Sequence, residues 1–202
     1  MGRSGRKEQE FKQREENIIQ TALVLFADHG IESVTIDMIA EQAQIGKGTI
    51  YKHFSSKNDI FATLIIRQGN EILSLLHSIS LTTPVMVQLK KTMQVFWDFR
   101  INDIRKFAVY RKCDQLLLMD GMAPGVLARF EQQNNMKNEF IRTMIQKAID
   151  EEIFRDESVD NYVAVAVGLF QGVFDLILKG DVQPSQDLYL LVEKMIFKGF
   201  MR

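Results

Sequence analysis

Apolar residues recur at intervals of three and four along most of the chain, which is the spacing of one face of a helix. The first such pattern covers residues 8–28 and has its apolar stripe at Ile18, Ala22, Leu25 and Phe26. His29 and Gly30 follow it, and glycine readily takes the left-handed backbone conformation just past a helix end. The pattern therefore predicts a first helix that stops at Gly30.

The same spacing predicts further helices in the rest of the chain. We expect one after Thr35, one from Gly46 to Phe54, one after Ser56, one opened by Pro84, and one each over residues 103–118, 126–149, 159–179 and 185–201, with a loop at residues 120–125. Only 3 of the 202 residues are proline and 12 are glycine, and no alternating pattern is long enough to build a sheet. The fold class that this predicts is all-α.

The chain divides into a small front part and a larger back part. The front part, residues 12–72, holds the short helices, and the back part, residues 73–202, has long helices with a richer apolar content. No stretch rich in proline or glycine separates the two parts. We therefore expect the fourth helix to join them rigidly.

Composition narrows the class of protein. Hydrophobic residues make up 46% and charged residues 25%, which is typical of a soluble globular chain. The N-terminal residues are charged and lack the apolar core of a signal peptide. The uncharged stretch 161–174 is too short to span a membrane. The single cysteine, Cys113, suits a reducing compartment. These features predict a cytoplasmic protein that does not enter the membrane.

Residues 35–54 have the pattern of a helix-turn-helix, two short helices with a tight turn at Gln44-Ile45-Gly46. In such a pair the second helix lies in the major groove of DNA. Ile50 and Phe54 lie four residues apart, so they share the inner face of the second helix. Four side chains are then left to project outward beside the small Gly48, namely Lys47, Thr49, Lys52 and His53.

The net charge of −1, from 25 basic and 26 acidic residues, hides two local basic segments. Residues 44–57 contain three lysines and no acid, and residues 3–14 contain five bases against two acids, so each segment carries +3. Lysine and arginine side chains that neutralise phosphates supply the salt-dependent part of DNA affinity. Local charge therefore allows DNA binding although the total charge does not suggest it.

The residues alone leave other classes open. A lysine-rich stretch of this length is also common on ordinary solvated surfaces, and the alternative is a helical small-molecule-binding dimer that does not bind DNA. An enzyme is less favoured, because the chain has no phosphate-binding glycine loop and no nucleophile elbow. The three histidines are widely spaced and lack a neighbouring acid pattern, so we expect no metal site and no cofactor.

The segment from about residue 12 to 68 resembles the DNA-binding domain of the TetR family of bacterial transcriptional regulators. The resemblance is carried by ALVLF at 22–26, His29-Gly30, Thr35, IAE at 39–41, IGKGTIYKHF at 45–54 and SKNDI at 56–60. One departure is Gly46, where the family often has a serine cap. Glycine is an acceptable cap at a cost of a few tenths of a kcal/mol.

The resemblance implies a role for each matched position. Lys47, Gly48 and Thr49 would meet bases and phosphates at the start of the recognition helix, and Tyr51, Lys52 and His53 would follow them in the groove. Thr35 would bind one phosphate and Lys57 another. The family represses more often than it activates, and a ligand in the larger domain shifts the first domain through the fourth helix. We therefore expect a repressor that is released from DNA by an effector.

The last two predicted helices carry more apolar surface than a monomer of this size can bury, since the one over 159–179 is apolar around its whole circumference. We expect a symmetric homodimer, as in TetR-like proteins, bound to a palindromic operator. The predicted interface residues are Val163, Val167, Phe170, Phe174, Leu188, Leu191 and Met195. The alternative is that both helices are simply core.

The centre of the larger part is rich in methionine and aromatic residues, which adapt to irregular apolar ligands. Met119 and Met122 belong to it, and a few polar residues lie within its apolar helices. The predicted effector site consists of Phe96, Trp97, Arg100, Tyr110, Asp114, Phe140, Gln171 and Asp175. This predicts a small, largely apolar effector, for which Asp175 would tolerate a positive charge.

Overall fold

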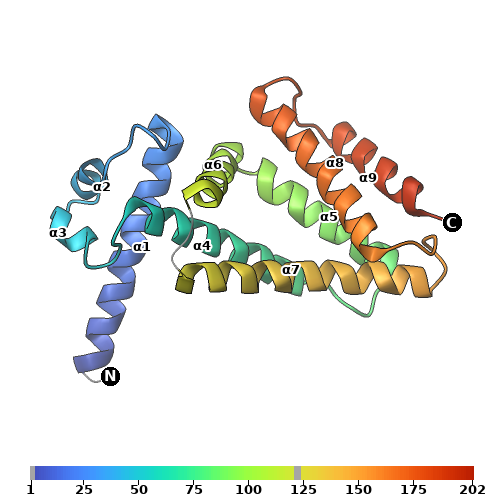
Figure 1. The fold of residues 1–202 in the computed structure, drawn as a ribbon, viewed down its shortest axis with the longest axis horizontal. Coiled ribbons are helices and arrows are strands. Elements are labelled where there is room, and N and C mark those ends of the chain that lie inside the picture. The colour runs from blue at the N-terminus through green and yellow to red at the C-terminus, as the bar shows by residue number, and fades with distance from the viewer. Residues whose placement is uncertain (1–2, 121–123) are drawn as a thin grey trace. The chain divides into compact units, whose positions relative to one another are not determined.

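The computed structural model describes residues 3–120 and 124–202, and these residues form nine helices and no strand (Figure 1). The helices are α1 (Arg3–His29), α2 (Ile36–Gln42), α3 (Lys47–Ile50), α4 (Lys57–His77), α5 (Val85–Ile101), α6 (Ile104–Asp120), α7 (Pro124–Asp150), α8 (Val159–Lys179) and α9 (Gln186–Phe200). The predicted all-α fold class is confirmed. Residues 121–123 of the predicted loop, with Met122, lie outside the described residues, as does the side chain of Met119.

Two helices differ from their predicted extent. Helix α1 begins at Arg3 instead of near residue 8, because ion pairs four residues apart stabilise its polar first turns. These pairs join Arg6 to Glu10 at 3.0 Å and Lys12 to Glu8 at 2.8 Å. Helix α3 ends at Ile50, and the next residues form turns in which the N–H of His53 donates to the carbonyl of Ile50 at 2.9 Å.

The chain forms two compact units. The first contains residues 1–68 and 105–130, and the second contains residues 69–104 and 131–202. Helices α4 and α7 therefore contribute residues to both units. This division differs from the expected one at residue 72, because helix α6 groups with the N-terminal helices although it lies far along the chain.

The first unit is built on the apolar stripe of α1. Ile18, Ala22 and Phe26 are buried, and so are Ile39 of α2 and Ile50 of α3. Helix α6 adds further buried side chains, namely Phe107, Val109, Tyr110, Cys113 and Leu117. Its exposed side carries an ion pair from Lys112 to Glu32 at 3.1 Å and a second from Arg105 to Asp28.

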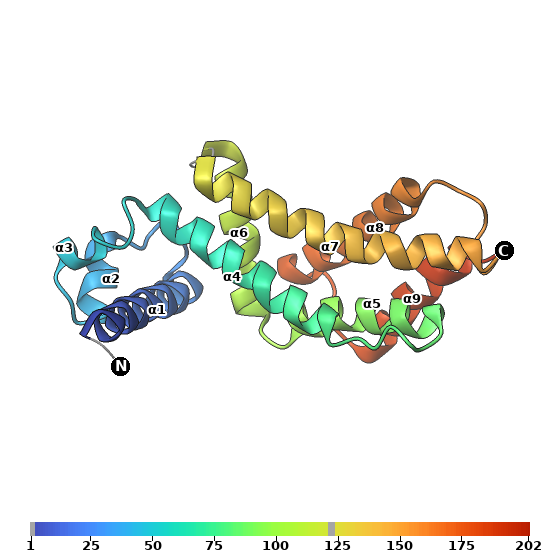
Figure 2. The same cartoon turned by 90° about the horizontal axis from the view of Figure 1, so that it is seen from below.

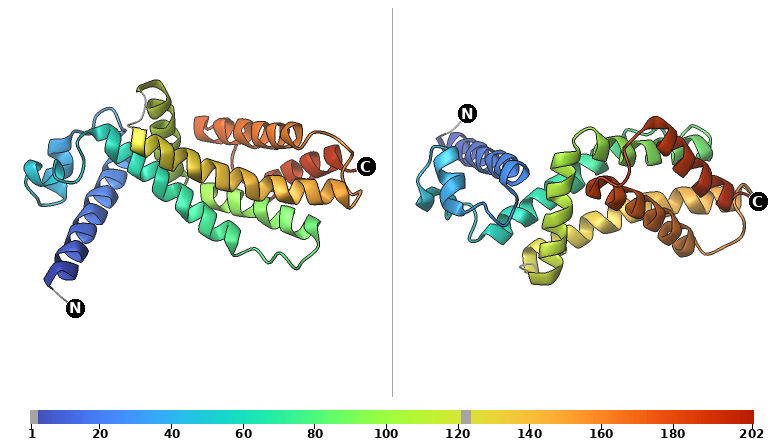
Figure 3. Two further views of the ribbon diagram at one scale, coloured as in Figure 1. Left: turned by 60° about the horizontal axis from the view of Figure 1, so that its bottom comes forward. Right: turned by 90° about the horizontal axis from the view of Figure 1, so that it is seen from above.

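The second unit is centred on Trp97 of α5. Its indole ring packs at 5.9 Å from Phe170 and 5.2 Å from Phe174, both of α8, and at 5.4 Å from Tyr189 of α9, measured between ring centroids. Helices α8 and α9 run side by side, and α5 lies against α9 (Figures 2 and 3). Along the other side, Gln133 of α7 donates to Asn70 of α4.

Four of the described residues have positive φ, all at helix ends or turns, and one of them is Glu152 in the turn after α7, with φ of +56°. Gly30, with φ of +80°, follows α1 as predicted, and Gly180, with φ of +82°, ends α8. Gln44 has φ of +55° in the turn between α2 and α3. There the N–H of Ile45 donates to the carbonyl of Ala40 at 3.0 Å, which closes the end of α2.

Gln44→Gly is expected to stabilise the protein, because glycine enters the left-handed region without the steric cost that a Cβ imposes. We expect a gain of about 0.5–1 kcal/mol in the free energy of unfolding, measured by urea denaturation followed by circular dichroism. The matched control is Gln42→Gly, at an exposed position in the last turn of α2, where glycine costs about 1 kcal/mol. If Gln44→Gly lowered the free energy of unfolding as much as Gln42→Gly does, the left-handed conformation assigned to Gln44 would be contradicted.

Candidate DNA interface and effector cavity

The helix-turn-helix is held by caps and by one ion pair across it. Thr35 caps α2, its hydroxyl oxygen accepting from the N–H of Met38 at 3.2 Å. Lys47, the first residue of α3, forms an ion pair with Asp37 of α2 at 2.9 Å. The hydrogen bond to Asp37 raises the pKa of Lys47, so the ammonium stays charged on this surface.

The outer face of the recognition segment is exposed as predicted. Lys47, Gly48 and Lys52 are exposed, Thr49 is partly exposed, and Tyr51 has 50% of its surface exposed. Ile50 and Phe54 are buried on the inner face. A Cβ at Gly48 would meet no atom within 4 Å, so the backbone here is open to a large partner.

His53 is packed against α1 instead of projecting outward. Its ring stacks on that of Phe11 with 3.9 Å between centroids. Its Nδ1 is buried and has no hydrogen-bond partner among the described residues. Burial lowers the pKa of this imidazole. The structure therefore ties His53 to the N-terminal half of α1, and the prediction that it points toward a groove is not supported.

Lys57 also differs from the prediction. Its ammonium donates to the carbonyl of Ile31 and lies 5.7 Å from the ring centroids of both Phe26 and Phe61. Burial lowers its pKa, as expected for a cation withdrawn from water. The predicted phosphate contact assumed that a lysine beside a helix start points outward. Here the carbonyl left by the turn after α1 and two aromatic faces draw it inward.

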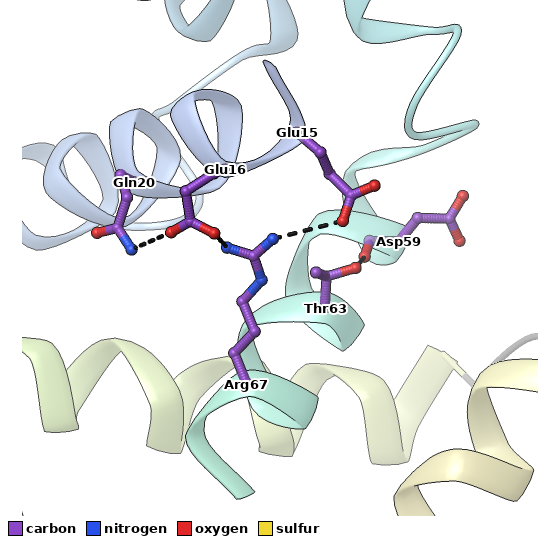
Figure 4. A network of polar contacts seen from close by, with 6 residues as sticks. All are labelled: Glu15, Glu16, Gln20, Asp59, Thr63 and Arg67. Atoms are coloured by element: carbon purple, nitrogen blue, oxygen red, sulfur yellow. Dashed lines mark hydrogen bonds and ion pairs between the residues drawn. The ribbon is translucent and has the colours of Figure 1, made fainter. Parts of the chain in front are cut away.

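A cluster of polar contacts joins α1 to α4 within the first unit (Figure 4). The guanidinium of Arg67 donates to Glu16 and to Glu15, the latter at 3.4 Å. Gln20 donates to Glu16 at 2.9 Å from the next turn of α1. One arginine thus holds two consecutive glutamates, and this fixes the rotation of α1 against the first half of α4.

The second unit contains a cavity of about 150 Å³. Its walls are almost entirely apolar, and its polar lining comes from Thr92, Arg100 and Gln171. The lining residues are Leu89, Thr92, Met93, Phe96, Arg100, Ile141, Ile145, Phe154, Val163, Ala166, Val167, Phe170, Gln171, Ile196, Phe197 and Phe200. A cavity of this size and character can hold a small apolar molecule.

The predicted effector residues are not all brought together. Phe96, Arg100 and Gln171 line the cavity. Asp175 does not, but it accepts a hydrogen bond from Gln171 at 2.9 Å. Trp97 is packed in the core behind Phe170, and Phe140 lines a separate groove beside His77. Tyr110 and Asp114 belong to the first unit. The predicted effector residues were chosen for their polar or aromatic character, and this character does not indicate which helices line the same cavity.

Helices α8 and α9 present a broad exposed apolar surface. Val167 is 55% exposed, Leu191 54% and Met195 60%, and Val165, Leu169, Leu176 and Leu190 are also exposed. Leu188 and Val163 are partly exposed. Phe170 and Phe174 are buried against Trp97, so these two predicted interface residues belong to the core. They were misassigned because a helix that is apolar all round does not reveal which side packs inward.

Helix α8 is the one helix among the described residues that is long and apolar enough to cross a membrane, although only 22% of that stretch is buried within the chain. The whole helix, Val159–Lys179, is longer than the uncharged stretch considered from the sequence. Length and composition do not distinguish a membrane span from a helix covered by a partner. The low burial means that most of this apolar stretch is exposed within the chain.

Within the described part of the chain, no group of three or more His, Cys, Asp or Glu side chains is placed to hold a metal ion. Cys113 is buried, and burial raises the pKa of its thiol to about 12. A thiol with so high a pKa is protonated at neutral pH and is a poor nucleophile.

Comparison with known proteins identifies the front of the chain. Residues 18–64 match the sequence profile described as "Bacterial regulatory proteins, tetR family". The fold of nearly the whole chain is similar to that of the fatty acid degradation regulator FadR from Bacillus halodurans, with a TM-score of 0.73 at 18% identity, covering 92% of this chain and 98% of that one. Residues 18–64 therefore belong to a domain of the tetR family.

Another tetR-family structure, PfmR from Thermus thermophilus, is similar with a TM-score of 0.72 at 14% identity, covering 92% of this chain and 99% of that chain. The sequence similarity to curated relatives is shorter. The probable acrEF/envCD operon repressor of Escherichia coli K12 is 37% identical over 62 residues, which is 31% of this chain and 28% of that protein. The activator FasR of Mycolicibacterium smegmatis is 27% identical over 92 residues, 45% of this chain and 42% of that protein.

Several residues that line the cavity of the second unit were not predicted from the sequence. Phe154, Phe197 and Phe200 close one part of it, and Ile141 and Ile145 of α7 form another wall. Their helical spacing marks them as core residues. No signal in the sequence distinguishes a core residue that faces a cavity from one that faces another side chain.

Lys57→Met is expected to destabilise the tetR-family domain, because it leaves the carbonyl of Ile31 without its charged donor while it keeps the apolar stem. We expect a loss of about 1–2 kcal/mol in the free energy of unfolding, measured by urea denaturation at pH 7. Lys52→Met, at an exposed position of the recognition segment, is the control and should leave this free energy unchanged. Equal stability of the two variants would contradict the inward placement of Lys57.

Proposed function

We propose that this protein is a ligand-responsive transcriptional regulator, a repressor that binds a palindromic operator as a homodimer and is released by a small, largely apolar effector. The observation that carries this is the exposed face of the recognition segment, where Lys47, Gly48 and Lys52 stand on a helix-turn-helix inside the matched residues 18–64. A dimer that does not bind DNA would not account for the exposed lysines of this segment, since residues 44–57 contain no acid.

The proposed DNA contacts come from both helices of the motif. Lys47, Gly48, Thr49, Tyr51 and Lys52 would enter the major groove. Thr35 would contribute its hydroxyl, which accepts from Met38 and keeps its own proton to donate to a phosphate oxygen. His53 would support the segment through Phe11. Lys57 is left out, because its ammonium points inward to the carbonyl of Ile31 and the rings of Phe26 and Phe61.

The proposed dimer uses the exposed faces of α8 and α9. On α8 the exposed positions 165, 169, 172 and 176 follow helical spacing, and Gly168 and Gly172 are small enough to let a second helix approach closely. Leu191 and Met195 extend the surface onto α9. A second copy of the chain would cover the apolar face of α8, which explains its low burial without a membrane. Two-fold symmetry would also match two half-sites about 34–36 Å apart.

The proposed effector site is the cavity of the second unit. FadR of Bacillus halodurans is described as a fatty acid degradation regulator, and the similar structure FrrA as flavonoid-responsive. Both descriptions fit cavities that take largely apolar molecules. An effector that binds one conformation of the dimer more tightly shifts its population by that difference in affinity. Such a protein would act in the cytoplasm and would need no catalytic group.

Lys52→Ala is expected to weaken DNA binding without changing the fold. Wild-type protein first selects its sites from a random-sequence DNA library, and affinities for the enriched site are then measured by fluorescence anisotropy between 50 and 300 mM salt. Removing one phosphate contact per subunit should lower affinity about tenfold at 150 mM salt and reduce the slope of log affinity against log salt by about one per subunit.

The control for this test is Lys91→Ala, which removes one charge from an exposed position of α5 in the second unit. It should leave both affinity and salt slope unchanged. Selection of no sequence, with weak binding to every DNA, would argue against a regulator. Normal binding by both Lys47→Ala and Lys52→Ala would place the DNA contacts elsewhere.

Leu191→Glu is expected to convert the dimer to a monomer, because it buries a charge in the centre of an apolar interface. Light scattering after size-exclusion chromatography at 10–100 µM protein measures the mass. Leu81→Glu is the matched control, since Leu81 is 64% exposed but lies outside α8 and α9. A monomeric wild type, or a Leu191→Glu variant with the mass of a dimer, would show that this surface is not the interface.

A further inference from the structure

The cavity of the second unit carries a single charge. Among its lining residues, all of which the structure describes, Arg100 is the one with an ionised side chain. Asp175, which accepts a hydrogen bond from the lining Gln171, does not itself line the cavity. The one charge in the cavity wall is therefore positive, which favours an anion there.

Aromatic rings hold the guanidinium in place. Its central carbon lies 5.5 Å from the ring centroid of Phe96, 5.2 Å from Phe170 and 5.1 Å from Phe174. It donates one hydrogen bond to the carbonyl of Phe96 at 2.8 Å. These contacts orient a planar group with five N–H donors at the cavity wall, and its geometry matches the two oxygens of a carboxylate.

The other polar groups in the wall are neutral. The hydroxyl of Thr92 is buried and donates to the sulfur of Met144 at 3.7 Å, a weak acceptor. Gln171 donates its amide N–H to Asp175, so the amide is oriented by a residue outside the cavity. Neither group adds a charge, and the remaining walls are aliphatic and aromatic.

Resting on the proposed function, we infer that the effector is a small amphiphilic carboxylate, whose anionic head pairs with Arg100 and whose apolar body fills the cavity. A volume of about 150 Å³ suits a body of roughly six carbons, the size of one benzene ring. This specifies more than the apolar effector proposed above and replaces the expectation that Asp175 would receive a positive charge.

The test compares three probes of equal chain length and different charge, namely octanoate, 1-octanol and octylamine, by isothermal titration calorimetry at pH 7.5 without DNA. We expect octanoate to bind at least thirtyfold more tightly than 1-octanol, and octylamine to bind more weakly than either. Hexanoate should bind about fourfold more weakly than octanoate, since its five-carbon body leaves about one of the six buried carbon positions empty. Trp97 is the single tryptophan and packs on Phe170, so its fluorescence reports whether the probe enters this cavity.

Two variants of Arg100 distinguish the contribution of its charge to binding from that of the apolar cavity. Arg100→Gln should lose the preference for octanoate but keep its affinity for 1-octanol, which also shows that the cavity is still folded. Arg100→Lys should retain part of the preference, because it keeps the charge without the planar fork. Lys91→Gln on the exposed side of α5 is the control and should behave like wild type.

Tighter binding of octylamine or of 1-octanol than of octanoate, or an octanoate affinity that Arg100→Gln leaves unchanged, would overturn the inference. The absence of binding by any of the three probes would overturn it as well. DNA binding is measured separately by anisotropy, so the two proposals fail independently. If octanoate binds through Arg100 but leaves the DNA affinity unchanged, the carboxylate site stands and the effector response fails.

Discussion

The burial of Ile50 and Phe54 is the constraint on which the DNA-facing surface depends. A helix of four residues such as α3 cannot be stable by itself, because the first turn costs more conformational entropy than its hydrogen bonds return. It persists because the side chain of Ile50, and that of Phe54 in the turn that follows, are buried in the core of the first unit. Their burial also determines which side of the segment faces solvent, and so leaves Lys47 and Lys52 outward.

The same principle explains why some polar side chains turn inward. A lysine can turn inward when its stem reaches a carbonyl or aromatic faces whose contacts compensate for the lost hydration of the ammonium. Lys57 does this at the carbonyl of Ile31. His53 is drawn to Phe11 in the same way. Arg67 uses its charge to hold two glutamates of α1. Because these side chains make contacts within the domain, fewer cations are available to bind DNA than the local charge count indicated.

The second unit shows a different balance between core and surface. One side of α8 packs on Trp97 through Phe170 and Phe174, and the other side stays apolar and exposed. Such a surface is costly in water, since each buried Leu or Val side chain is worth about 1.5–3 kcal/mol. Next to the core side, imperfect packing leaves a cavity that contains one guanidinium. A surface for association and a space for a ligand thus arise from the same helix.

The sequence by itself determined the helices, the end of α1 at Gly30 and the helix-turn-helix, because these depend on local spacing, on caps and on glycine. It also located the exposed recognition residues. Ile50 and Phe54 lie four residues apart and therefore mark the inner face, which leaves the other side chains of the segment outward. Only the tertiary structure decided where Lys57 and His53 point, that α6 groups with the N-terminal helices, and which side of α8 is core. It alone brought Arg100 and Gln171 to one cavity. These features depend on contacts between residues far apart in the chain, and a pattern of neighbours carries no information about them.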